Sequence, residues 1–87
     1  MPYIKQNEKN LYEYYLKNIS QFITNPGELT YCIYRLMLLM TKKNNKSFAN
    51  MSSIIGSIEC AKMEYYRRIV SPYEDKKIKE NGDVDET

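Results

Sequence analysis

Histidine is absent from the 87-residue sequence, and its absence excludes several common kinds of functional site. Imidazole is the usual general base of hydrolytic triads, the commonest metal ligand and the ordinary pH switch near neutrality. The sequence therefore predicts a protein that is not an enzyme, binds no metal and carries no cofactor. Catalysis by a pair of carboxylates is also not favoured, because Glu59 and Glu64 would lie on different faces of a helix.

Cysteine and long hydrophobic runs are also scarce. Cys32 and Cys60 both lie in apolar stretches with helical spacing, which favours buried thiols in a reducing compartment over a disulfide. The longest apolar run covers residues 36–40, far short of the roughly 18 residues that a membrane-spanning helix needs, and the first residues carry no signal-peptide pattern. We therefore expect a cytoplasmic protein that does not contact a membrane.

Apolar residues recur at spacings of three and four and predict three main helices, over about 7–24, 28–42 and 51–70. The few prolines and glycines separate them, since residues 25–27 read Asn-Pro-Gly, which breaks a helix and forms a turn. Residues 42–47 are polar and predict a loop. The expected fold class is all-α, a small bundle of three main helices with a polar C-terminal segment, completed by oligomerisation.

The third helix is expected to begin at a cap formed by Asn50 or Ser52 and to end before Pro72. Residues 1–79 hold all 13 basic and 7 of the acidic residues, whereas residues 80–87 hold four acidic residues and no basic one. The sequence thus predicts a single helical domain over 1–79, able to hold an anion, followed by an acidic tail over 80–87.

The helix predicted over 28–42 is apolar around nearly its whole circumference, which is typical of a helix buried on several sides. An 87-residue chain has too few other helices to cover it, so a second copy is the expected cover. The opposite side of the third helix presents small or soft side chains that favour a second contact face, with a poorly optimised surface as the alternative. The predicted oligomer interface comprises Ile33, Met37, Leu38, Met40, Gly56, Cys60 and Met63.

Basic and aromatic residues concentrate near the end of the third helix. Arginine offers a planar pair of donors to phosphate, and tyrosine offers a ring face to a base, so these types suit an anionic nucleotide. The alternative is that Arg67 and Arg68, about 100° apart on a helix, cap its C-terminal end while Glu64 pairs with Arg68. Polymeric nucleic acid is not favoured, because no known binding motif is present. The predicted ligand-binding residues are Lys62, Tyr66, Arg67, Arg68, Tyr73, Lys76 and Lys77.

Several segments carry a resemblance to a known family. They read GELTY, IIG, ECAK and YYRRIVSPYEDKKIKENGDV, at residues 27–31, 54–56, 59–62 and 65–84. Together they resemble a family of short proteins of tailed bacteriophages and prophages that end in such a segment. The resemblance covers most of the chain and is loosest before residue 25 and over 42–50. It implies a small helical protein made in an infected bacterium, and it transfers no activity to any residue.

Two functions fit this context. The first is a sponge, in which pockets of a homo-oligomer sequester a nucleotide signal of host immunity and so act as an anti-defence device. The second is a helical protein–protein interaction module that inhibits or adapts a host protein. The first requires affinity for a small anionic ligand and the second requires a surface for a protein partner.

Replacing Leu38 by Glu should convert the assembly into monomers or aggregates, because a charge would then lie in the predicted oligomer core. Size-exclusion chromatography with light scattering measures the mass directly. An assembly of unchanged mass and solubility would show that Leu38 lies outside the interface.

Overall fold

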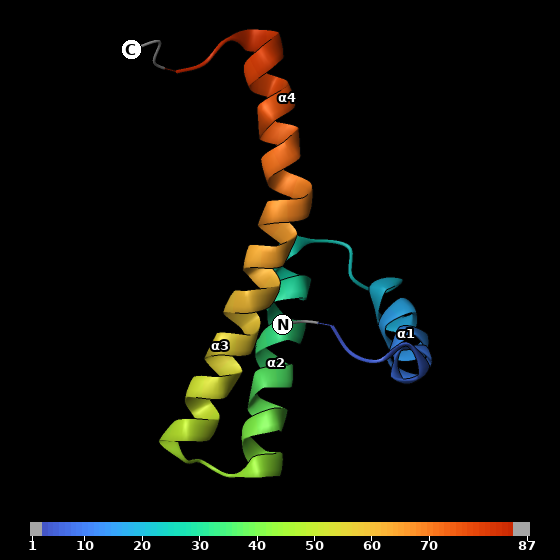
Figure 1. The fold of residues 1–87 in the computed structure, drawn as a ribbon. Helices are drawn as coiled ribbons and strands as arrows, with labels where there is room; N and C mark the ends of the chain where they lie inside the picture. Colours follow the sequence, from blue (N-terminus) through green and yellow to red (C-terminus); the bar gives the residue numbers. More distant parts are fainter. Residues whose placement is uncertain (1–2, 85–87) are drawn as a thin grey trace. The chain divides into compact units, whose positions relative to one another are not determined.

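The computed structural model describes residues 3–84, which form helices joined by short connections and contain no strand (Figure 1). This confirms the all-α fold class. The chain divides into two compact units, one of residues 3–55 and one that begins at Gly56. In chain order the elements are α1 (Gln6–Ser20), α2 (Pro26–Asn44), α3 (Phe48–Tyr65), the π-helical turn η1 (Tyr66–Val70) and α4 (Ser71–Asn81).

The connection between α1 and α2 ends in a side-chain cap at the N-terminus of α2. The Asn25 side chain accepts a hydrogen bond of 2.9 Å from the backbone N–H of Glu28, and the Glu28 carboxylate accepts from the backbone N–H and the hydroxyl of Thr24, at 2.7 and 3.0 Å. Pro26 occupies the first helical position, where its missing N–H costs nothing. The prediction placed these boundaries wrongly. Thus α1 ends at Ser20 instead of 24, and α2 begins at Pro26 instead of 28.

The same cap makes the stability of the fold depend on pH. Hydrogen bonds from the backbone and side chain of Thr24, and from Asn25, hold the pKa of Glu28 below its ordinary value of 4.5. Because the folded pKa is lowered, this group stabilises the fold at pH values above 4.5. The contribution is lost as the pH falls through the folded pKa.

The loop between α2 and α3 is shorter than the predicted 42–47. Helix α2 continues to Asn44, and Asn45 adopts a positive φ of 111° directly after it. The Ser47 hydroxyl then accepts a hydrogen bond of 3.0 Å from the backbone N–H of Asn50. Ser47 is therefore the cap of α3, and the prediction of Asn50 or Ser52 in this role was wrong. Asn50 instead donates its side-chain amide to the Asn45 carbonyl at 2.6 Å.

Pro72 does not end the helical path, which is a second correction to the prediction. Proline lacks an N–H, and its ring collides with the carbonyl four residues earlier in an α-helix. The turn before it widens to the π form, in which the Ser71 N–H donates to the Tyr66 carbonyl, five residues back. The chain then continues into α4 without a break (Figure 1). The widened turn is how the helix accommodates Pro72.

The π turn aligns two side chains that an uninterrupted α-helix would not. The Tyr66 hydroxyl donates a hydrogen bond to the Glu74 carboxylate, eight residues later. A spacing of eight lies about 80° off one face of an α-helix, but one extra residue in the turn brings position eight close to the usual position seven. The hydrogen bond and the charge of Glu74 raise the pKa of Tyr66 above its ordinary value of 10.0, with a smaller effect from Asp75.

The polar C-terminal segment that the sequence predicted forms helix α4 over most of its length. The helix ends at Asn81 and is followed by Gly82, whose φ of 83° suits glycine and whose N–H donates to the Ile78 carbonyl at 2.8 Å. Its last turn carries an ion pair of 3.2 Å between Lys77 and Glu80. The first two residues of the predicted acidic tail are therefore helical, whereas its residues 85–87 lie outside the described part of the chain.

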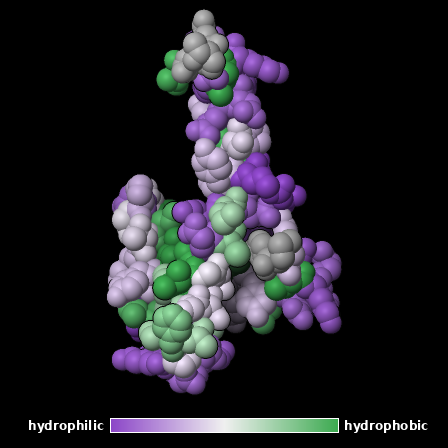
Figure 2. All heavy atoms as spheres, turned by 60° about the vertical axis from the view of Figure 1, so that its left-hand side comes forward, coloured by the Kyte–Doolittle hydropathy of each residue, from purple (hydrophilic) through white to green (hydrophobic). Residues whose placement is uncertain are grey.

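Within residues 3–84 no side chain is fully buried. The face drawn in Figure 2 shows hydrophobic side chains at the surface beside hydrophilic ones. The apolar residues that come nearest to burial are half-buried, namely Ile23, Cys32, Met37, Ile54 and Val70. Each unit by itself therefore leaves most of its apolar surface uncovered.

Replacing Asn25 by Ala should lower the free energy of unfolding by about 1 kcal/mol, because the first turn of α2 loses its cap. Asn25→Asp keeps an acceptor at the same position and should stay close to the natural protein. Urea unfolding followed by circular dichroism measures both variants. Equal stability of the two would contradict the capping role.

Replacing Glu74 by Gln should return the pKa of Tyr66 towards 10.0, because a neutral amide carries no negative charge that opposes ionisation of the phenol, and its NH2 group can donate to the phenolate. A raised folded pKa stabilises the protein below pH 10 and ceases to do so as the pH rises through it. The measurement is a pH titration of the Tyr66 ring carbon by NMR, with Asp75→Asn as the matched control. A larger shift in the control would assign the effect to Asp75.

Candidate ligand site at the end of helix α3

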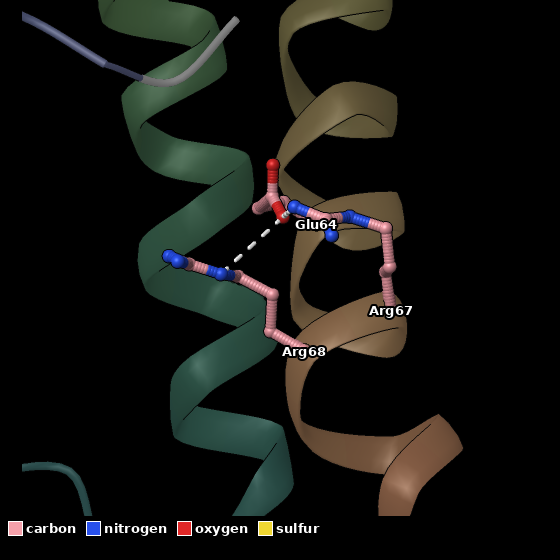
Figure 3. A network of polar contacts seen from close by, with 3 residues as sticks. All are labelled: Glu64, Arg67 and Arg68. Carbon is pink, nitrogen blue, oxygen red and sulfur yellow. Dashed lines mark hydrogen bonds and ion pairs between the residues drawn. The ribbon is translucent and has the colours of Figure 1, made fainter.

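Three charged side chains meet where α3 passes into η1 (Figure 3). Arg67 donates to the Glu64 carboxylate, and the Arg68 Nε lies 3.7 Å from the same oxygen, Oε1. We call these three residues the arginine cluster. The Glu64 side chain is only 18% exposed, whereas those of Arg67 and Arg68 are 70% and 59% exposed. One sheltered carboxylate oxygen thus serves two exposed guanidinium groups.

The cluster follows from sequence spacing. Arg67 and Arg68 stand three and four residues after Glu64, the two spacings that bring helical side chains together. The predicted pairing of Glu64 with Arg68 is confirmed. The rest of that alternative, in which the arginines cap a helix end, is wrong because the chain continues as η1 and α4. The long side chains converge although their backbone positions diverge.

An open hollow of about 530 Å³ adjoins the cluster. It shares Glu64 and Arg68 with the cluster, and its other lining residues are Ala61, Tyr65 and Ile69. The Tyr65 ring is 63% exposed. Charged side chains, an aromatic ring and apolar side chains therefore lie side by side on adjacent stripes of the helix.

Two further predicted ligand residues flank the cluster but contact other partners. Lys62 forms an ion pair of 3.0 Å with Glu59, one turn earlier. Tyr66 directs its hydroxyl to Glu74, on α4. Both side chains are exposed, so they border the site without joining the arginine cluster.

The remaining predicted ligand residues form a separate group on α4. The Lys77 ammonium lies 5.6 Å from the centre of the Tyr73 ring, which is a cation–π contact. These two residues line a second hollow of about 470 Å³ together with the acidic Glu74 and Asp75. Lys76 is exposed on the same helix. The acidic lining makes this second hollow a poorer anion site than the arginine cluster.

The predicted interface residues lie on α2 and α3, and they are exposed with one exception. Met37 is half-buried, whereas Ile33, Leu38 and Met40 on α2 are exposed to about two fifths. On α3 the side chains of Cys60 and Met63 are exposed, and a Cβ added to Gly56 would meet no atom within 4 Å. These positions are open to a partner.

The chemistry of the cluster suits an anion, since two guanidinium groups lie close to one carboxylate oxygen. Within residues 3–84 no group of three or more Cys, Asp or Glu side chains is placed to hold a metal ion. No helix among those residues is long and apolar enough to cross a membrane.

The residues predicted from the sequence did not include Tyr65 and Glu64, which lie at the candidate site. Ala61, Tyr65 and Ile69 recur at a spacing of four, which places them on one helical stripe but does not say whether that stripe is covered. Glu64 suggested only a surface ion pair. The spacing of 61, 65 and 69 beside 64 and 68 was the available signal, since it places the aromatic and charged residues on adjacent stripes.

Comparison with known proteins identifies the family of the chain. It does not yield a relative of known function. No curated protein matches the chain, and no solved structure matches it. The family model described as "Domain of unknown function (DUF6899)" matches residues 1–84. Because the match covers nearly the whole sequence, the chain belongs to the DUF6899 family.

Proposed function

We propose that this protein is a non-catalytic sponge, a homo-oligomer that sequesters a small anionic nucleotide at the arginine cluster. The observation that carries the proposal is the convergence of Arg67 and Arg68 on one carboxylate oxygen beside the exposed ring of Tyr65. A phosphate accepts from the same donors as a carboxylate, and guanidinium groups bind either through paired hydrogen bonds. The neighbouring ring offers a face for a base or a sugar.

Tight sequestration requires more enclosure than one helix provides. Nanomolar affinity corresponds to about −12 kcal/mol, and ligand sites of that quality surround most of the ligand. The hollow beside the cluster is open, so a second copy is the natural source of its missing wall. This links the ligand site to oligomerisation.

The uncovered apolar surface supports association of copies. Within residues 3–84 no side chain is fully buried, and large apolar side chains of α2 are exposed. A standard protein interface covers about 800 Å² on each partner, and its centre is apolar. The exposed residues of α2, Ile33, Leu38 and Met40, are the proposed centre of the contact.

The biological setting of the proposal rests on the resemblance to phage and prophage proteins. A chain that acts by binding alone fits an anti-defence role in the cytoplasm of an infected bacterium. There the ligand would be a nucleotide signal of host immunity. Removing such a signal requires affinity and stoichiometric amounts of protein, and no catalytic group.

A second candidate function is that of a helical module that binds and inhibits or adapts a host protein. It is favoured by an apolar hollow of about 470 Å³ at the junction of α1 and α2. The hollow is lined by Ile19, Ile23 and Tyr31 among others, and the Phe22 ring at its edge is 78% exposed. Exposed aromatic side chains around an apolar depression are typical of protein-binding surfaces.

Replacing Arg67 or Arg68 by Ala should abolish nucleotide binding while leaving the oligomer mass unchanged, because each variant removes donors to phosphate and no apolar contact of α2. Native mass spectrometry with cyclic dinucleotides and ADP-ribose-type nucleotides reads the oligomer mass and the bound ligand together.

Arg35→Ala is the matched control, since it removes the same charge from α2. Ligand at 100 times its dissociation constant should also stabilise the natural protein by about 2.7 kcal/mol, which thermal unfolding detects. Unchanged affinity in both cluster variants would refute the proposed site. An oligomer that takes up none of these nucleotides would favour the protein-binding candidate.

A further inference from the structure

The arginine cluster already holds an anion, and that anion is part of the chain. The Glu64 carboxylate lies against both Arg67 and Arg68 (Figure 3). Its side chain is the least exposed of the three. The two guanidinium groups of the cluster therefore already face a carboxylate of the chain itself.

Arg67 and Arg68 both approach the same oxygen of Glu64, Oε1. The negative charge of Glu64 therefore offsets part of the positive charge of the two guanidinium groups. An anion that binds them meets the opposing charge of Glu64 and competes with it for the two groups.

A neighbouring ion pair on the same helix differs from the arginine cluster in its exposure and its place. Glu59 pairs with Lys62 at 3.0 Å, again over a spacing of three residues. Glu59 is 54% exposed, three times the fraction of Glu64, and it does not line the hollow. The two glutamates carry the same charge on the same helix, but only Glu64 lies between the arginines.

We propose that Glu64 is an internal competitor that occupies the phosphate position of the arginine cluster and is displaced when an anionic ligand binds. The inference rests on the proposed function, and it adds how that site is regulated. The ligand class is one that carries a phosphate or pyrophosphate group. Binding exchanges one carboxylate for one phosphate at the guanidinium groups, so the affinity reflects the difference between the two interactions.

The test is isothermal titration of the full chain with inorganic pyrophosphate at low ionic strength, comparing the natural protein with Glu64→Gln and Glu59→Gln. Glutamine keeps the size of the side chain and removes its charge. Glu64→Gln should bind pyrophosphate roughly three- to tenfold more tightly, as expected for the loss of one competing ion pair. Glu59→Gln removes the same charge together with the ion pair of Lys62. Neither residue lines the hollow, so the affinity should change by less than about twofold.

Two results would overturn the proposal. Glu64→Gln that binds as the natural protein does, or more weakly, would make Glu64 a positioning residue or a bystander. An equal gain in Glu59→Gln would show that net charge, and not the cluster, controls binding. Circular dichroism of each variant confirms that the helices are intact.

A second measurement needs no variant. In the natural protein the Nε–H NMR signal of Arg68 should shift as pyrophosphate is added, because the anion beside the guanidinium group changes from carboxylate to phosphate. An unmoved signal at saturating pyrophosphate would also overturn the proposal. If pyrophosphate competes with Glu64 but no nucleotide binds, the nucleotide sponge fails while the inference stands. If nucleotides bind and Glu64→Gln gives no gain, the inference fails while the sponge stands.

Discussion

The constraint on which the rest of the structure depends is that this chain does not cover its own apolar side chains. Within residues 3–84 no side chain is fully buried, although 43% of the sequence is hydrophobic. Most of the stability of protein helices comes from packing an apolar face against a neighbour, and propensity alone leaves short helices marginal. Helices of 11 to 19 residues with this composition therefore need a further surface to pack against. The proposed association of copies would supply such a surface.

Local hydrogen bonds define the helix boundaries where packing does not. The start of α2 depends on Asn25 and Thr24, and the start of α3 depends on the hydroxyl of Ser47. The Asn25 and Ser47 side chains each accept from a backbone N–H that the first turn of a helix leaves without a partner. Thr24 donates its backbone N–H to the Glu28 carboxylate. These caps keep the elements distinct in a chain that has little buried surface to separate them.

The π turn before Pro72 connects the ligand site to the last helix. The wider turn accommodates the proline, which has no N–H to donate. It also places Glu74 so that its carboxylate accepts a hydrogen bond from the Tyr66 hydroxyl. The same stretch carries Arg67 and Arg68, which converge on Glu64. Charged groups of both signs are thus paired along the helix, and this pairing is the reason why the proposed ligand would have to compete with Glu64.

The sequence by itself determined the all-α class, the existence of three helices and the pairing of Glu64 with Arg68, because periodicity and spacing along a helix are local properties. It did not determine the exact helix limits, since Asn25 and Ser47 act as caps only in backbone conformations that several nearby polar residues could equally have adopted. Only the three-dimensional structure decided that Pro72 widens a turn instead of ending a helix. It also decided that both arginines share one carboxylate oxygen, and that the stripe of Ala61, Tyr65 and Ile69 lines an open hollow. The physical reason is that rotamers, turn width and the choice of covered face depend on atoms several residues away, which a one-dimensional pattern does not contain.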